Sequence, residues 1–313
     1  MTDIVGKRKW YFLLSALIII PGLIAMGVSM LRYGTPVRLS IDFTGGALLE
    51  LAFEKPVSPA EVRQVFVARG YGDTTAQNTT DAKTVLIRSK DLESTEKATL
   101  EAVLTDRFGP LTELRFAQVG PTVGREVTRS AGIAIAAAAI AIMGFIMFAW
   151  RRVPNAWRYG ICATTATLHD VLVTMGLFSL LGLLLGWEAD SLFLTAMLTV
   201  TGYSVQDTIV VFDRIRENTP KRRGEPYELI VNRSLLETLH RSLATQLNAI
   251  FILVAVLLFG GANIRQFIAI LLIGLISGTY SSIFTAVPLL VVWEKGEIGA
   301  LFRRLFGRSR ATA

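Results

Sequence analysis

The sequence of 313 residues contains a single cysteine, Cys162, and only two histidines. One cysteine excludes an intramolecular disulfide bond, and because Cys162 falls within an apolar run it does not reveal the redox compartment. The sequence also lacks the HExxH, paired-cysteine and nucleophile-elbow patterns of metalloproteases, metal sites and esterases. We therefore expect a protein that is not an enzyme and that holds no metal or cofactor.

A nucleotide-binding P-loop is absent as well. The segment Gly120-Pro121-Thr122-Val123-Gly124-Arg125 has neither the lysine nor the hydroxyl residue with which the motif G-x-x-x-x-G-K-[ST] holds phosphates and Mg²⁺. The chain is therefore not expected to hydrolyse nucleotides. If it couples energy, the proton gradient is the source that remains.

Acidic residues are fewer than basic ones, 25 against 32, which gives a formal net charge of +7. An excess of positive charge suggests a protein that binds nucleic acid. Much of this charge, however, flanks long apolar runs, where it sets the orientation of membrane helices. Hydrophobic residues make up 52% of the sequence, and several runs reach the roughly 20 residues that cross a bilayer. The composition predicts an integral membrane protein that contacts lipids and binds no nucleic acid.

Six membrane spans are predicted, at 10–31, 130–150, 159–186, 191–212, 242–260 and 265–293. The first follows Lys7-Arg8-Lys9 and is too long for the apolar core of a cleavable signal peptide. Lysine and arginine are concentrated in the short segments placed inside, so the positive-inside rule puts both termini in the cytoplasm. The basic tail, 294–313, either lies on the membrane surface or is disordered.

The segment 32–129 differs in kind, because its charges balance and both helix and strand periodicities occur in it. Strands are predicted at about 47–53, 74–79, 84–88 and 111–119, with helices after Ser58 and at 95–108. Ser58-Pro59-Ala60-Glu61 has the pattern of a capping box. The order βαββαβ is that of a ferredoxin-like α+β domain. We expect a small extracytoplasmic domain, 32–129, between the first span (1–31) and a five-helix membrane domain (130–293).

Asp207 lies inside the apolar segment 191–212, six residues before Asp213 at its charged end. At 1.5 Å per helical residue, Asp207 sits roughly 9 Å inside the membrane edge. An ionised carboxylate at that depth costs about 2.5 kcal/mol or more unless it is paired, hydrated or protonated. Asp207 is therefore a candidate for an ion or proton path; the alternative is a structural acid that bonds a neighbouring helix through Ser204 or Thr208.

Other polar residues in the spans have two interpretations each. Arg241 opens the fifth span, where it is either functional or an interfacial arginine with its charge in water. His169 and Asp170, adjacent in the third span, point to different helix faces and need not bond each other. They form either a relay or a satisfied core pair. Small residues in the last span indicate close helix packing: Gly274, Ser277, Gly278, Ser281 and Ser282.

Several motifs together resemble the SecF family, the smaller membrane subunits of the SecD–SecF protein-export complex. The resemblance runs in order from the first span to the last, and the Gly202–Glu217 block carries most of its specificity. The motifs are Asp42-Phe43-Thr44-Gly45-Gly46, Val119-Gly120-Pro121-Thr122-Val123-Gly124-Arg125-Glu126, Leu168-His169-Asp170, Gly202-Tyr203-Ser204 through Asp207 to Glu217, Thr238-Leu239-His240-Arg241, Phe259-Gly260-Gly261 and Gly278-Thr279-Tyr280-Ser281-Ser282.

This resemblance implies residue roles. Asp207 corresponds to the transmembrane acid of the family that is implicated in proton flow, and Arg241 to the arginine that acts with it. Tyr203 and Gln206, like His169 and Asp170, are assigned either to a relay or to helix packing. Two departures affect the hydrogen bonding around the acid: Gln206 replaces the usual Asn, and the stretch after Arg241 carries the amides Gln246 and Asn248 where Ser and Thr are usual.

The resemblance also implies architecture and partners. The family is related to the proton-driven RND transporters, so six spans would form half of an RND-type bundle, and a SecD partner would supply the other half. The implied partners are SecD, the SecYEG translocon, SecA and preproteins, at the cytoplasmic (inner) membrane. In the implied cycle, protonation of Asp207 removes its attraction to Arg241 and helices rearrange.

The predicted function is a subunit that couples the proton motive force to the export of preproteins. An RND-type exporter of small molecules or lipids is the first alternative, and a large apolar substrate cavity would favour it. The second is a membrane scaffold whose buried charges only fix the register of its helices.

Overall fold

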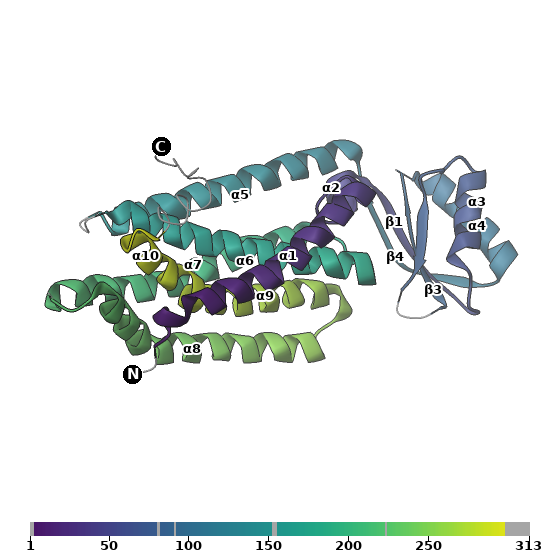
Figure 1. Cartoon of the computed structure of the whole chain (residues 1–313). Helices are drawn as coiled ribbons and strands as arrows, with labels where there is room; N and C mark the ends of the chain where they lie inside the picture. Colours follow the sequence, from purple (N-terminus) through teal and green to yellow (C-terminus); the bar gives the residue numbers. More distant parts are fainter. Residues whose placement is uncertain (1–2, 80–81, 91, 152–154, 223, 298–313) are drawn as a thin grey trace, which may run out of the picture. The chain divides into compact units, whose positions relative to one another are not determined.

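The structure is a computed structural model that describes residues 3–79, 82–90, 92–151, 155–222 and 224–297 (Figure 1). The chain divides into two compact units. One comprises Met1–Arg38, Ala134–Trp187 and Leu192–Ala313, and the other comprises Leu39–Ile133 and Glu188–Ser191. The tail for which the sequence left a surface helix and disorder as alternatives, from residue 298 onward, lies outside the described residues.

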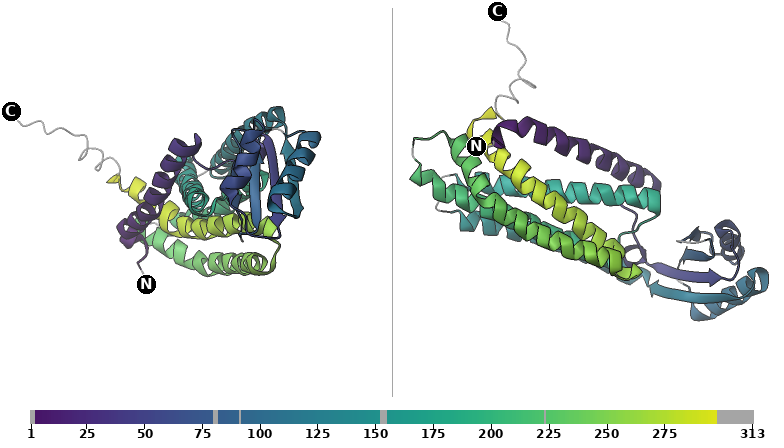
Figure 2. Two further views of the ribbon diagram at one scale, coloured as in Figure 1. Left: turned by 90° about the vertical axis from the view of Figure 1, so that its right-hand side faces the viewer. Right: turned by 90° about the horizontal axis from the view of Figure 1, so that it is seen from below.

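The first unit is helical (Figure 2). Its elements are η1 (Val5–Lys7), α1 (Arg8–Tyr33), most of α5 (Pro121–Ala149), α6 (Ala156–Leu185), α7 (Ser191–Lys221), α8 (Tyr227–Phe259), α9 (Ala262–Ser281), η2 (Ser282–Ala286) and α10 (Val287–Glu294). Among the described residues, five helical segments are long and apolar enough to cross a membrane: Val5–Tyr33, Pro121–Ala149, Trp157–Leu185, Tyr227–Phe259 and Ile264–Glu294. The protein is a multi-pass membrane protein.

Helix α7 contains the predicted span 191–212 but does not belong to those five. Its sequence explains why, since threonines, Ser204, Gln206 and Asp207 interrupt its apolar residues. Twelve of its side chains are nevertheless buried, including that of Asp207. A helix of this kind lies inside a bundle, where its polar groups find partners, instead of facing lipid.

Helices α7 and α8 extend well beyond the predicted spans, which ended at 212 and began at 242. Hydropathy marks where a segment leaves lipid, whereas the helix continues as long as its surface is stabilised. Ion pairs three or four residues apart do this on the last turns of α7. Arg216 lies 2.6 Å from Asp213, Arg214 lies 2.7 Å from Glu217, and Lys221 lies 2.6 Å from Glu217.

Glycines set the closest approach between α1 and α6. A Cβ atom on Gly22 would lie 2.8 Å from the Cα atom of Gly176, and one on Gly176 would lie 2.6 Å from the Cα atom of Gly22. Neither position therefore tolerates a side chain without movement of a backbone, as is common where membrane helices cross. Gly274 on α9 plays the same part against Val200 on α7.

A π-helical turn, η2, separates α9 from α10 within one continuous helical rod. It ends two residues before Pro288, which has no amide hydrogen to continue the α-helical ladder. Such π turns recur next to functional sites. The polar cluster described below includes Ser281, the last residue of α9, which adjoins this turn.

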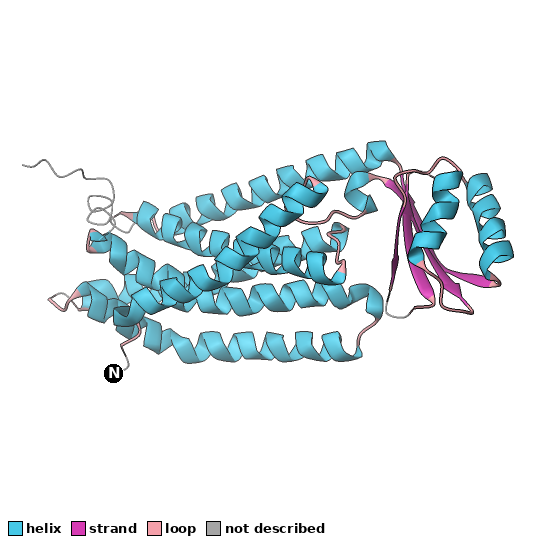
Figure 3. Ribbon diagram, turned by 45° about the vertical axis from the view of Figure 1, so that its right-hand side comes forward, coloured by secondary structure: helices cyan, strands magenta, loops and turns pink. Residues whose placement is uncertain are grey.

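The second unit contains α2 (Ile41–Thr44), β1 (Gly46–Phe53), α3 (Pro59–Ala68), β2 (Thr75–Asn78), β3 (Thr84–Ser89), α4 (Ser94–Phe108) and β4 (Leu111–Val119). The strands form an antiparallel sheet in the order β2-β3-β1-β4, with Leu49 opposite Ile87 on one side and Phe116 on the other. Helices α3 and α4 cover one face of this sheet (Figure 3). Between them lies a core that includes Leu51, Phe66 and Leu104.

The predicted elements occur close to their expected places, with two local differences. The Ser58 side chain makes no capping hydrogen bond; its carbonyl oxygen accepts the amide hydrogen of Glu61 at 3.0 Å, so the first turn closes through the backbone. The short helix α2 was not predicted, because four residues carry no periodicity. It is capped by Ser40, whose side chain accepts from the Asp42 amide.

The Gly45-Gly46 pair requires glycine at both positions. Their φ angles are +74° and +116°, which L side chains rarely adopt. A Cβ atom on Gly45 would lie 2.8 Å from the Cα atom of Pro121, and one on Gly46 would lie 2.5 Å from the Ser89 carbonyl oxygen. The pair therefore lets β1 begin directly against the start of α5.

Residues Glu188–Ser191, which follow α6, belong to the sheet unit. Ala189 forms a parallel bridge with Leu39, and its carbonyl oxygen accepts the Ser40 amide hydrogen at 2.8 Å. The Asp42 carboxylate accepts both the amide hydrogen of Ser191, at 2.9 Å, and its hydroxyl hydrogen, at 2.8 Å. Asp42 thereby holds the first residue of α7.

Candidate functional site

Asp207 is buried, with 5% of its surface exposed. Its Oδ2 atom accepts a hydrogen bond of 2.6 Å from Nε2 of Gln246 on α8, and Gln246 is equally buried. Ser204 and Thr208, the partners expected of a structural acid, bond elsewhere: Ser204 to Asp170 and Thr208 to the Ser204 carbonyl oxygen. A neutral amide is thus the partner of the predicted carrier acid. Sequence comparison had treated Gln246 only as a departure.

Arg241 lies on the same helix as Gln246, five residues earlier and therefore about 7.5 Å away along the axis. In the described part of the chain, its side chain is exposed and lines a polar cavity of about 440 Å³. The structure therefore brings Asp207 to Gln246 and leaves Arg241 at the charged end of the bundle. The cavity is also lined by Ala149, Trp150, Ile209, Val210, Asp213, Arg214, Arg216, Glu217, Glu237 and Thr238.

Tyr203 and Gln206 lie on the exposed side of α7 and are not brought to Asp207. Tyr203 is 47% exposed and lines an apolar cavity of about 230 Å³, together with residues such as Ile252 and Leu271. Both residues belong to the α7 surface and not to the polar interior.

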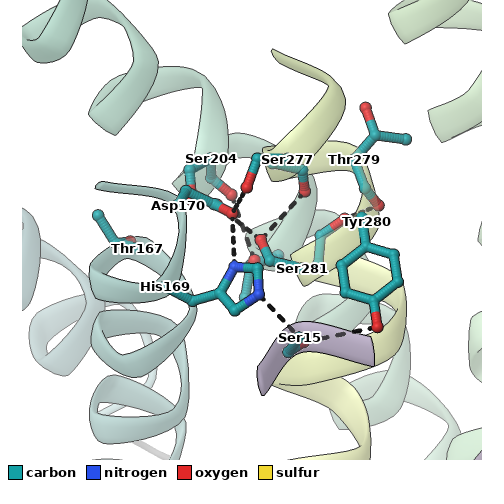
Figure 4. Close-up of polar contacts among 12 residues, drawn as sticks. Ser15, Thr167, His169, Asp170, Ser204, Ser277, Thr279, Tyr280 and Ser281 are labelled. Carbon is teal, nitrogen blue, oxygen red and sulfur yellow. Dashed lines mark hydrogen bonds and ion pairs between the residues drawn. The ribbon is translucent and has the colours of Figure 1, made fainter. Parts of the chain in front are cut away.

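Asp170 is the most enclosed charged group of the bundle described here, with 0% of its surface exposed (Figure 4). Its Oδ1 atom accepts from His169, at 3.0 Å, and from Ser277, at 2.6 Å. Its Oδ2 atom accepts from Ser204, at 2.5 Å, and from Ser281, at 2.6 Å. Each carboxylate oxygen thus accepts two hydrogen bonds, and the four donors come from α6, α7 and α9.

The His169 ring connects this carboxylate to α1. Sequence reasoning held that adjacent residues on a helix need not bond; here they do, because the imidazole ring reaches back to a carboxylate at the junction of three helices. Its Nε2 atom lies 3.1 Å from the Ser15 hydroxyl oxygen, which is 3.5 Å from the Tyr280 hydroxyl. Tyr280 donates to the Tyr11 carbonyl oxygen at 2.7 Å, and its ring stacks on His169.

Comparison with known proteins identifies the family. Residues 99–296 match the family described as protein export membrane protein SecD/SecF, C-terminal, and residues 33–57 match the SecD/SecF GG motif. The protein translocase subunit SecF of Thermobaculum terrenum is 49% identical over the full length of both chains. The chain belongs to the SecF family.

Other members of the SecF family and solved structures support the assignment. SecF of Vibrio alginolyticus is 37% identical, over 90% of this chain and 87% of the relative. The crystal structure of SecDF from Thermus, described as a translocon-associated membrane protein, superposes with a TM-score of 0.79 at 30% identity. The match covers 94% of this chain but 39% of that one, so this SecF-family chain spans about two fifths of the length of SecDF.

The SecF-family match contains all the buried polar residues of the site except Ser15, and the glycine motif contains Asp42. Sequence reasoning identified Asp207, His169 and Asp170 but missed the serines that surround Asp170. It had assigned Ser277 and Ser281 to packing because they are small. Their spacing of four residues, which puts two hydroxyls on one helix face, was the signal available for a polar role.

Proposed function

We propose that this chain is an accessory subunit of the Sec protein translocase and that it couples the proton motive force to preprotein export together with a SecD partner. The observation that carries the proposal is a buried carboxylate, Asp207, in contact with a neutral amide. A carboxylate held by a neutral donor is stable with or without a proton, whereas one held by fixed cations stays ionised. Asp207 is therefore suited to bind and release protons.

The polar cavity supplies the access that this role needs. It is lined by Ile209 and Val210, which follow Asp207 by two and three residues, and it opens among the charged side chains at one end of α7 and α8. In the proposed cycle, the protonated acid rests on Gln246. Loss of the proton leaves a charge that attracts Arg241 along α8, and the helices adjust to bring the two together.

Asp42 offers a way to transmit this adjustment. Because its carboxylate holds the amide and hydroxyl of Ser191, the first residue of α7, a shift of α7 along its axis acts on the Gly45-Gly46 segment and strand β1. Asp207 lies further along the same helix. The protonation site and the sheet unit are thus joined by one helix.

The wider architecture follows from this proposal. Helix α7 provides the sixth span, and the six spans form half of an RND-type bundle whose other half is SecD. The sheet unit, with its βαββαβ order and strand order β2-β3-β1-β4, is a ferredoxin-like domain on the outer side of the cytoplasmic membrane. Both termini are cytoplasmic, and the complex works with the SecYEG translocon, SecA and preproteins.

Thiol labelling tests this orientation, because the one native cysteine, Cys162, is buried. A membrane-impermeant thiol reagent added outside should label G72C and should leave K221C unlabelled; the reverse pattern would refute the orientation.

The exporter alternative called for a large apolar cavity. The two apolar cavities between the helices measure about 230 and 280 Å³. Pockets for drug-sized ligands have volumes of about 300–1,000 Å³. These two cavities lie below that range and so give the exporter alternative no support.

Export into inverted membrane vesicles tests the proposed role of Asp207. Asp207→Asn keeps the size and the hydrogen bonding but fixes the neutral state, so we expect normal assembly with SecD and loss of the gradient-dependent part of export. Asp106→Asn is the matched control, because Asp106 is an exposed acid of α4 that lies outside the polar cavity. Vesicles with equal amounts of each variant are compared with and without an uncoupler. Full gradient-dependent export by Asp207→Asn would eliminate Asp207 as the carrier.

A further inference from the structure

The Asp170 carboxylate has no acceptor position left for a proton. An ionised carboxylate offers about four lone-pair sites, and four donors occupy them, two on each oxygen. A further proton on either oxygen would displace a donor from a fully buried site, whereas the hydrogen between Oδ1 and His169 Nδ1 can sit on either atom without loss of that bond. Such displacement leaves a buried polar group unsatisfied. If this pair binds a proton reversibly, the added hydrogen therefore appears at Nε2 of His169, which faces Ser15 and not the carboxylate.

The hydrogens around Ser15 show how a proton on His169 would be accommodated. His169 uses its Nδ1 hydrogen toward Asp170, so Nε2 carries a lone pair in the neutral ring and a hydrogen in the imidazolium. Tyr280 uses its hydroxyl hydrogen on the Tyr11 carbonyl oxygen. The single hydroxyl hydrogen of Ser15 then has two acceptors, His169 Nε2 at 3.1 Å and the Tyr280 oxygen at 3.5 Å.

Only one charge state of the His169–Asp170 pair provides a hydrogen for both contacts of the Ser15 hydroxyl. With a neutral ring, Ser15 donates to Nε2 and the contact with Tyr280 has no hydrogen. With an imidazolium, Nε2 donates to Ser15, Ser15 donates to Tyr280, and Tyr280 donates to the Tyr11 carbonyl oxygen in an unbroken chain.

We infer that His169 is a second proton-binding residue of this chain and that the Ser15 hydroxyl turns from His169 to Tyr280 when the proton binds. The proton adds to the Nε2 lone pair, no covalent bond breaks, and the charge of the pair changes from −1 to 0. As a step of proton-coupled export, this inference rests on the proposed function; as a property of the bundle, it does not.

The surroundings of His169 suit this exchange of charge. Asp170 faces it from its own helix, and Tyr280 of α9 stacks on it with ring centroids 5.9 Å apart. An aromatic face stabilises a cation. On α1 the titratable neighbour is Tyr11, whose ring packs on Phe284 of η2. On α7 it is Asp207, three residues beyond Ser204 but bonded to Gln246.

The proton would strengthen the connection between α1 and α9. Tyr280 already bonds the backbone of α1 at Tyr11, and the turned Ser15 hydroxyl adds a second bond one helical turn further on. Seven residues beyond Ser15, α1 is fixed on α6 by the contact of Gly22 with Gly176. Protonation of His169 therefore adds its bond on the amino-terminal side of this contact, where Arg8 already pairs with Glu228 of α8.

The two histidines of the chain make a direct test practical. His240, the other one, is exposed, so His240→Gln leaves His169 as the source of every imidazole ¹⁵N signal. In the full chain in lipid, we expect the Nδ1–H neutral tautomer at high pH and a hydrogen on Nε2 at low pH, within the pH window in which the chain stays folded. An Nε2 atom that keeps one protonation state over this window, or an Nε2–H tautomer at high pH, would overturn the inference.

Mild variants test the part played by Ser15. At a fixed pH within the window, Ser15→Ala removes the acceptor of the Nε2 hydrogen and Tyr280→Phe removes the second acceptor of Ser15, so both should reduce the doubly protonated fraction of His169. Ser29→Ala is the matched control, because Ser29 is a buried serine of α1 that bonds the Thr35 carbonyl oxygen. Equal fractions in Ser15→Ala and Ser29→Ala would exclude the proposed turn of the hydroxyl.

An export assay separates this inference from the proposed function. His169→Gln cannot bind the proton, and we expect loss of gradient-dependent export at normal protein level. Asp207→Asn should also lose export while the ¹⁵N titration of His169 persists. Suppose that His169 titrates but that His169→Gln exports like the wild type. His169 would then bind a proton without a part in coupling, and only the claim about coupling would be refuted. If neither variant affected export while His169 titrated, the proposed function would fail and the second proton site would stand.

Discussion

Asp170 and Asp207 are two buried carboxylates in the same bundle, and they differ in their partners. Asp170 accepts four hydrogen bonds from three helices, whereas one amide donor, Gln246, serves Asp207. The two are also connected, because Ser204, a donor to Asp170, lies one turn before Asp207 on α7. A saturated carboxylate fixes helices in place. A carboxylate with a single neutral donor keeps the freedom to gain or lose a proton.

Depth in the membrane therefore does not by itself identify a proton carrier. Both acids are expensive in lipid, and the sequence shows both. In our proposal, the number and kind of donors around each carboxylate separate a positioning role from a carrier role. The predictions below test this distinction from the largest expected effect to the smallest.

Removal of the Asp170 carboxylate should have the largest effect on stability. Asp170→Leu leaves His169, Ser204 and Ser277 without their acceptor and Ser281 with only the Gly278 carbonyl oxygen, and breaking a buried charged pair costs about 3–5 kcal/mol. Asp207→Leu leaves one amide unsatisfied, at about 1–3 kcal/mol. We expect a much lower thermal midpoint for the purified full chain with Asp170→Leu than with Asp207→Leu. Equal midpoints would mean that the two carboxylates do not differ in their structural role.

Gln246 should matter to export more than its position on an apolar helix suggests. Gln246→Leu removes the donor to Asp207 and leaves the carboxylate alone in the bundle, so gradient-dependent export in matched vesicles should fall strongly. Asn248→Leu provides the control, because Asn248 is an exposed amide two residues later on the same helix. If both variants exported equally, the bond between Gln246 and Asp207 would have no part in coupling.

Arg241 distinguishes the static structure from the proposed cycle. The structure leaves its side chain at the polar cavity, so neither Arg241→Lys nor Arg241→Met should destabilise the chain. Export should nevertheless decline in both, and less in Arg241→Lys, which keeps the charge but loses the planar guanidinium. Thermal midpoints and vesicle export are measured together. Unchanged export in Arg241→Met would remove Arg241 from the cycle.

Much of the fold follows from the sequence for physical reasons. Apolar runs near 20 residues locate the membrane helices, and alternating or helical periodicity locates the elements of the sheet unit. Helices α7 and α8 continue beyond the predicted spans, because hydropathy reports the lipid boundary and not where the helix stops. The four residues of α2 are too few for any periodicity.

The site was less predictable than the fold. Asp207 and Asp170 stand out as charges in apolar segments, but their partners lie 39, 34, 107 and 111 residues away along the chain. Serine and glutamine are common enough that no local pattern marks them as partners of a buried acid. Only the packing of α6, α7, α8 and α9 brings these side chains together.

The serines of the Asp170 cluster should contribute individually. A hydrogen bond to a charged group contributes about 1.5–3 kcal/mol, so Ser277→Ala and Ser281→Ala should each lower the stability of the full chain by about that amount. The double variant should fall short of the sum, because Asp170 can relax once one donor is lost. Ser282→Ala is the control, since this buried serine bonds the Thr279 carbonyl oxygen within its own helix. An effect of Ser282→Ala as large as the others would refute the special role of Asp170.

The smallest effect extends the comparison to two carboxylates of the sheet unit, Glu101 and Glu113. Burial, together with a contact with Glu113, raises the pKa of Glu101, whereas the Lys97 ammonium, 2.5 Å away, lowers the pKa of Glu113. Glu101 therefore stabilises the fold at low pH and loses this contribution as pH rises through its raised pKa. Glu113 stabilises it above its ordinary pKa and loses this contribution as pH falls through its lowered pKa.

Substitution of the two glutamates should consequently have opposite signs near neutral pH. Glu101→Gln keeps a donor for Glu113 without a buried charge and should stabilise the unit, whereas Glu113→Gln loses the pair with Lys97 and should destabilise it. Each change should be below about 1 kcal/mol, because these side chains are partly exposed. Hydrogen exchange of the α4 and β4 amides in the full chain, at about pH 4 and pH 7, measures both. The gain of Glu101→Gln should shrink at the lower pH, where wild-type Glu101 is itself protonated. If both substitutions changed the stability of the unit in the same direction at neutral pH, the partners of the two carboxylates would not decide which of them holds a proton.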